Sequence, residues 1–132
     1  DDPQRGLFYS KLFFFTNDLQ PALKRYFYAH RYARDKQDIA WTRQVAKDMA
    51  CERWGVLGRY LLDNGPYHLG ERFSLVDLHM ALWAAYGFEG PDDILDAFPG
   101  VRRCYDLVAQ RPKSGPLLGG LRRQVAELRS GG

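Results

Sequence analysis

Apolar residues recur every three or four positions along most of the chain, and this spacing predicts α-helices. The first helix runs from about Pro3 to Tyr32. Pro21 lies inside this pattern, and we expect a kink there because proline lacks a backbone N–H and crowds the carbonyl of Asn17. The apolar side of this helix consists of Phe8, Leu12, Phe15, Leu19, Leu23 and Tyr26.

A second long helix begins near Asp35 and ends at Asn64-Gly65-Pro66, where glycine and proline stop it. Its apolar positions fall on one side at helical spacing, and we expect them to be buried. They are Ile39, Val45, Ala46, Met49, Val56, Leu57 and Tyr60.

Three shorter helices complete the pattern. One spans Ser74 to about Tyr86, the next follows Pro99 and stops before Pro112, and the last opens at Ser114-Gly115-Pro116. Asp92 to Ala97 forms one short turn, and no segment reads as a convincing strand. Long helices joined by short polar loops predict an all-α fold, an antiparallel bundle of about five helices in a single domain over 1–132. The apolar positions of the last helix are Leu117, Leu121, Val125 and Leu128.

The start of the third helix carries a nearly complete capping box. Ser74 is placed to accept the backbone N–H of Asp77 with its hydroxyl, and the Asp77 carboxylate reaches back to the N–H of Ser74. Phe73 precedes the cap and Leu78 holds the fourth helical position, the pair that forms a hydrophobic staple. These residues account for Asp77 structurally, so we do not assign it a catalytic role.

Cysteine and histidine spacing gives no sign of a metal site or a disulfide framework. Cys51 and Cys104 are isolated, and His30, His68 and His79 show no metal-ligand spacing with them or with one another. We expect each histidine in a loop or at the edge of the core, and we identify no catalytic residue. Free cysteines fit a reducing compartment. Because we also recognise no signal peptide and no apolar run of roughly 18 residues, we expect a cytoplasmic protein.

The net charge of +3 makes the chain mildly basic. The pairs Arg102-Arg103 and Arg122-Arg123 have the chemistry to touch phosphate, but we expect them on solvated helix faces. We identify no basic stripe interleaved with stacking aromatics, the pattern that favours nucleic-acid binding. We therefore expect no nucleic-acid partner and no membrane partner.

The first helix contains more aromatic side chains than one face of a helix in a small bundle can bury. Some of these rings must meet another surface, which is a neighbouring domain, a partner subunit or an apolar ligand. The sequence alone leaves these three alternatives open. The rings are those of Phe8, Tyr9, Phe13, Phe14, Phe15, Tyr26, Phe27, Tyr28 and Tyr32.

Two stretches resemble a known family. Residues 67–77, which include the capping box, resemble the loop and cap that open the central helix of the C-terminal domain of glutathione transferases. Residues 98–105, closing in Arg111-Pro112, are similar to the next helix of that domain. With the two long helices before them, the resemblance covers essentially the whole chain. The chain departs from the family by carrying Val76 where a small residue is usual.

The resemblance implies a role in conjugating glutathione to electrophiles. In this family an N-terminal thioredoxin-like domain binds glutathione, the co-substrate, and activates its sulfur. That domain is absent from this chain, which begins directly at a helix entry and which we therefore expect to be inactive alone. The helical domain supplies an apolar pocket for the electrophilic small molecule. By position, Tyr9, Phe13 and Asn17 are the candidates for its wall.

Two kinds of partner follow from the same resemblance. The first two helices usually form the dimer interface of the family, so a homodimer is expected for the intact protein. Domains resembling this one also occur in translation factors and aminoacyl-tRNA synthetases, where they serve assembly without catalysis. A non-catalytic interaction module of the same fold is therefore the alternative function.

Overall fold

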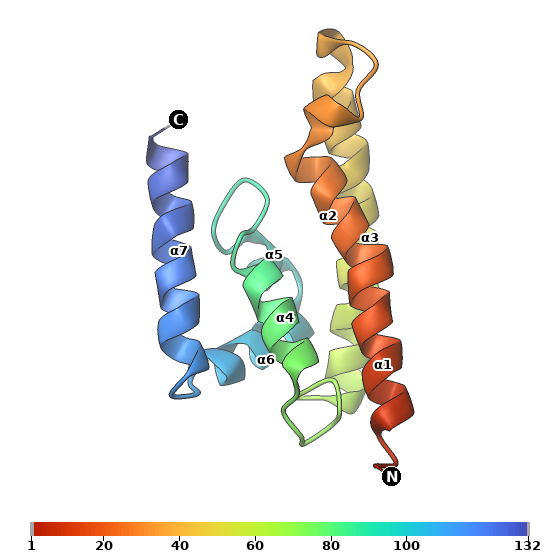
Figure 1. Cartoon of the computed structure of the whole chain (residues 1–132), viewed down its shortest axis with the longest axis vertical. Coiled ribbons are helices and arrows are strands. Elements are labelled where there is room, and N and C mark those ends of the chain that lie inside the picture. Colours follow the sequence, from red (N-terminus) through yellow and green to blue (C-terminus); the bar gives the residue numbers. More distant parts are fainter. Residues whose placement is uncertain (1, 132) are drawn as a thin grey trace.

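The computed structural model describes residues 2–131, and helices make up most of them (Figure 1). The predicted first helix is built from three consecutive pieces, and two short 3-10 turns connect it to the second long helix. In chain order the elements are α1 (Arg5–Phe14), the π-helical turn η1 (Phe15–Leu19), α2 (Gln20–Phe27), η2 (Ala29–Arg31), η3 (Lys36–Asp38), α3 (Ile39–Asn64), α4 (Leu75–Ala84), α5 (Asp93–Ala97), α6 (Pro99–Ala109) and α7 (Ser114–Ser130).

At the place where we expected a kink, the first helix contains a π-helical turn. The backbone N–H of Gln20 donates to the carbonyl of Phe15, five residues earlier, immediately before Pro21. A five-residue spacing of this kind is typical of a π-bulge within an α-helix. The widened turn accommodates the missing donor of Pro21, and the helix continues through it into α2 (Figure 1).

The bundle places α4 at its centre. The first helix and α3 lie side by side and run antiparallel, while α6 passes behind the lower part of α4, and α7 lies on the opposite side of α4 from α1 (Figure 1). Residues on several sides of α4 are buried, as expected for a central helix. They are Val76, Asp77, Met80, Ala81 and Ala84.

The all-α fold and the order of the helices confirm the sequence prediction, with shifts at the ends. The first helix ends at Phe27 rather than Tyr32, because its last residues form a 3-10 turn. Within residues 2–131 there is no strand, only isolated antiparallel bridges from Tyr67 to Gly70 and from Leu69 to Arg72. No helix described here is both long enough and apolar enough to cross a bilayer.

Two predicted buried faces are partly wrong. In α3, Val45 and Val56 are exposed, and Trp54 fills the core instead. In α7, Leu117 and Leu128 are exposed; Val125 is buried as predicted, and Leu118 is buried as well. Both helices carry apolar residues on more than one side, so periodicity alone did not select the side that packs against the bundle.

Candidate functional site

The predicted pocket wall lies on the exposed side of the first helix. The side chains of Tyr9 and Phe13 are 42% and 55% exposed. Their rings stack, with centroids 6.0 Å apart and planes inclined by 24°. Asn17, one further turn along, is exposed within the π-helical turn. Tyr9, Phe13 and Asn17 together are called the aromatic strip below.

A pocket of about 320 Å³ opens where the start of α1 meets the loop before α4. Of the aromatic strip, Tyr9 lines this pocket, whereas Phe13 and Asn17 lie outside it. The Gln4 amide donates a hydrogen bond of 3.0 Å to the Leu69 carbonyl and so ties the two segments together. The lining mixes rings with charged groups and consists of Asp2, Gln4, Arg5, Phe8, Tyr9, Leu69, Arg72, Phe73 and Ser74.

The charges at the mouth of this pocket compensate one another in part. Arg72 forms an ion pair with Asp2, and this hydrogen bond is the main reason why the pKa of the Asp2 carboxyl is lowered. The Arg5 guanidinium lies over the Tyr9 ring at 5.9 Å from its centroid. The pocket is therefore suited to an apolar or aromatic group with a polar end near its mouth.

The predicted capping box is present at the start of α4. The backbone N–H of Ser74 donates to Oδ2 of Asp77 at 2.7 Å, and the Ser74 hydroxyl lies 3.3 Å from the same oxygen. Phe73 and Leu78, the predicted staple pair, are half-buried and line the same pocket of about 360 Å³. The guanidinium of Arg111 covers the Phe73 ring at 3.8 Å.

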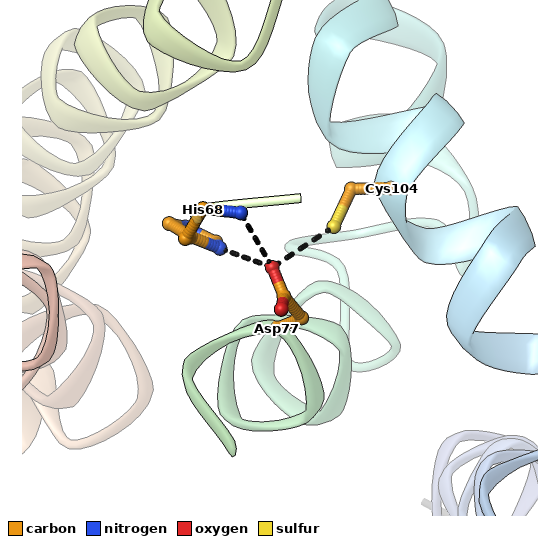
Figure 2. A group of neighbouring side chains, drawn as sticks. All are labelled: His68, Asp77 and Cys104. Atoms are coloured by element: carbon orange, nitrogen blue, oxygen red, sulfur yellow. Dashed lines mark hydrogen bonds and ion pairs between the residues drawn. The ribbon is translucent and has the colours of Figure 1, made fainter. Parts of the chain in front are cut away.

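The second oxygen of Asp77 holds two more segments in place. Oδ1 accepts the backbone N–H of His68 at 2.8 Å and lies 2.6 Å from His68 Nδ1. The Cys104 thiol of α6 also points at Oδ1, at 3.5 Å. Figure 2 shows the three side chains converging from the loop, from α4 and from α6. All three are buried, so the carboxylate links three parts of the bundle.

The protonation states of this cluster follow from burial and hydrogen bonding. Burial alone would raise the pKa of the Asp77 carboxyl, but the hydrogen bonds from His68 and Ser74 outweigh it, and the pKa is lowered. Burial raises the pKa of the Cys104 thiol strongly, and the neighbouring carboxylate raises it further. The thiol is therefore protonated at neutral pH and able to donate to Asp77.

The cluster of His68, Asp77 and Cys104 has the residue types of a metal site, because its potential ligand atoms lie within 4.8 Å of one another. Its geometry fits a hydrogen-bonded brace better. The 2.6 Å between His68 Nδ1 and Asp77 Oδ1 is a hydrogen-bond distance. Two ligands of one tetrahedral zinc ion, each about 2.0–2.1 Å from it, stand about 3.3 Å apart. We assign the cluster a structural role.

Sequence reasoning did not bring these three residues together. We expected His68 in a loop or at the edge of the core, and it lies in a loop but is completely buried. Cys104 and Asp77 are 27 positions apart, so no local motif connects them. The one signal in the sequence was that His68 shortly precedes the capping box. The Asp77 carboxylate uses one oxygen in that box and has a second oxygen free to accept another hydrogen bond.

Three of the four arginines considered for phosphate binding make contacts within the fold. Arg102 pairs with Asp96 at 2.5 Å, and Arg122 pairs with Asp92 at 2.8 Å. Arg103 donates to the carbonyl of Leu61 at the end of α3. These contacts link neighbouring segments of the bundle.

Comparison with known proteins gives one family. The family model described as "Glutathione S-transferase, C-terminal domain" matches residues 17–113, which is more than half of the chain. No curated protein and no solved structure matches this chain.

Proposed function

We propose a function from one premise: the chain belongs to the family of glutathione S-transferase C-terminal domains. In the intact protein this domain forms one side of the site where glutathione is joined to an electrophile. Its part is to hold an apolar electrophilic molecule beside the glutathione sulfur. Holding the two reactants together and excluding water lowers the barrier to attack by the thiolate.

The observation that carries this proposal is the aromatic strip. Tyr9 and Phe13 stack on each other, yet both remain substantially exposed. Exposed, ordered aromatic rings are typical of surfaces that another group covers. The adjoining pocket, which Tyr9 shares with Phe8 and Phe73, has room for a small apolar molecule.

The cysteines of this chain do not supply an activated sulfur. Burial raises the pKa of both Cys51 and Cys104, so neither is a ready thiolate at neutral pH. Membership of the family supports a division of labour in which an N-terminal thioredoxin-like domain binds and activates glutathione. The helical domain then contributes the aromatic strip and the pocket beside it.

We also propose that the intact protein is a homodimer formed by the first two long helices. The outward side of α3 exposes Val45, Val56 and Leu62. Between α1 and α3 lies a groove of about 120 Å³, lined by Ser10, Lys11, Phe14, Val56, Leu57 and Tyr60. An apolar helix face beside a groove is well suited to a partner subunit. The same surface supports the alternative function, a non-catalytic assembly module.

Turnover of glutathione with a general aryl halide distinguishes these functions. The full product of the coding sequence should accelerate the reaction, and the chain of residues 1–132 alone should not exceed the uncatalysed rate. Turnover by the chain alone would refute the division of labour. A full product that binds a protein partner but shows no turnover would support the assembly module instead.

A further inference from the structure

The end of the hairpin formed by α2 and α3 is strongly basic. Residues 24–43, here called the hairpin tip, contain six lysines and arginines but only two aspartates, whereas the whole chain has 19 against 16. The tip includes the end of α2, both 3-10 turns and the first turn of α3. It projects beyond α4 and α6 at the upper end of the molecule (Figure 1).

Most of the positive charge at the hairpin tip is unpaired. Arg34 forms ion pairs with both aspartates of the tip, with Asp35 at 3.1 Å and with Asp38 at 3.7 Å. Within residues 2–131, no carboxylate lies within ion-pair distance of the other five cations of the tip. These are Lys24, Arg25, Arg31, Lys36 and Arg43, and all five are exposed.

Three large aromatic side chains stand among these cations. Tyr28, Tyr32 and Trp41 are 45%, 56% and 71% exposed. Arg31 lies over the Tyr28 ring at 4.6 Å, and Arg25 lies over the Tyr32 ring at 6.0 Å. Guanidinium groups thus lie near the faces of two of the rings, and Trp41 is the most exposed of the three.

We propose that the hairpin tip binds single-stranded nucleic acid. The unpaired cations contact backbone phosphates, and the exposed rings stack on unpaired bases, which is the combination used by proteins that bind single strands without sequence preference. This role is separate from the transferase site, because the aromatic strip begins at the other end of the first helix.

The side-chain composition favours nucleic acid over an anionic membrane. Surface helices that insert into a membrane carry a whole apolar face of Trp, Phe and Leu to bury at the boundary of the acyl chains, and a single Trp with two Tyr does not make such a face. The exposed large apolar side chains of the hairpin tip are Tyr28, Tyr32 and Trp41, with no Leu, Ile or Phe among them. Flat rings with polar edges beside guanidinium groups fit stacked bases better.

The inference revises our expectation of no nucleic-acid partner. The sequence offers basic pairs at Arg102-Arg103 and Arg122-Arg123, and three of these four arginines, Arg102, Arg103 and Arg122, make contacts within the fold. The sequence predicts the end of one helix at Tyr32 and the start of the next near Asp35, with Tyr26 on the buried side of the first. The structure confirms that Tyr26 is buried but turns Tyr28 and Tyr32 outward.

Fluorescence polarisation of a short labelled oligouridine at low salt tests the proposal. We expect the oligouridine to bind. The logarithm of its association constant should fall linearly with the logarithm of salt concentration, with a slope of about −0.7 per phosphate contacted. The double variant Arg25→Gln/Arg31→Gln should weaken binding and reduce the slope by about 1.4. The matched control, Lys113→Gln/Arg123→Gln, removes the same charge from exposed positions outside the tip. It should leave the affinity and the salt slope unchanged.

The stacking component has its own variant. Trp41→Ala should weaken binding about 5- to 150-fold, the range that corresponds to losing one stacked base. Leu128→Ala, at another highly exposed side chain, is the control and should have no effect. Absence of binding, equal loss in tip and control variants, or binding to vesicles of anionic phospholipid but not to the oligonucleotide would each overturn the proposal.

Discussion

Replacing Asp77 by alanine should destabilise the protein far more than the loss of a helix cap. The carboxylate accepts the backbone N–H of Ser74 on one oxygen, and the backbone N–H and ring of His68 on the other. It also faces the Cys104 thiol. In Asp77→Ala these donors lose their acceptor while they remain inside the bundle.

The expected size of the effect follows from this arrangement. Losing an N-cap alone costs about 1 kcal/mol. Each buried donor left without a partner costs about 1–3 kcal/mol. Because several donors lose their acceptor together, we expect Asp77→Ala to lower the free energy of unfolding by about 3–5 kcal/mol, and Ser74→Ala by about 1 kcal/mol.

Urea denaturation followed by far-ultraviolet circular dichroism measures both variants at neutral pH. If Asp77→Ala is too unstable to purify, Asp77→Asn keeps an acceptor oxygen at the same place and gives an intermediate loss. A loss for Asp77→Ala no larger than that for Ser74→Ala would refute the reasoning. The carboxylate would then act only as a cap and not as a brace between three segments.

Three further predictions concern the core and the aromatic strip. Trp54→Ala should cost about 3–5 kcal/mol on urea denaturation, because the ring is completely buried; a loss below 1 kcal/mol would place Trp54 outside the core. Burial lowers the pKa of His79, so the unfolded state binds more protons and stability should fall as pH drops below about 6.5. His79→Phe should flatten this decline, and an unchanged pH profile would contradict it. In the full product, Phe13→Ala should raise KM for an apolar aryl halide and leave KM for glutathione unchanged; equal changes would count against the role of the aromatic strip.

Local signals predicted much of the fold. The spacing of apolar residues placed the helices, and Ser74 with Asp77 marked the start of α4. Pro21 marked the irregular turn of the first helix, because a missing N–H acts within a few residues. Such features depend on neighbours in sequence, so the sequence is sufficient to find them.

Features that depend on packing were less accessible. Val45 and Val56 were assigned to the core from their spacing, but α3 is apolar on more than one side and turns them to solvent. His68 and Cys104 meet Asp77 only because a loop and α6 converge on the start of α4. Periodicity says which residues share a face of one helix, but not which face another helix covers.

A crystal structure of the full product with an S-alkyl glutathione bound would test the central claim most directly. That claim is that the aromatic strip was left exposed for the electrophile beside glutathione. We predict that the alkyl group contacts Tyr9 and Phe13 while the peptide part lies on the N-terminal domain. An alkyl group bound away from both rings, or rings covered by another part of the chain, would contradict the account.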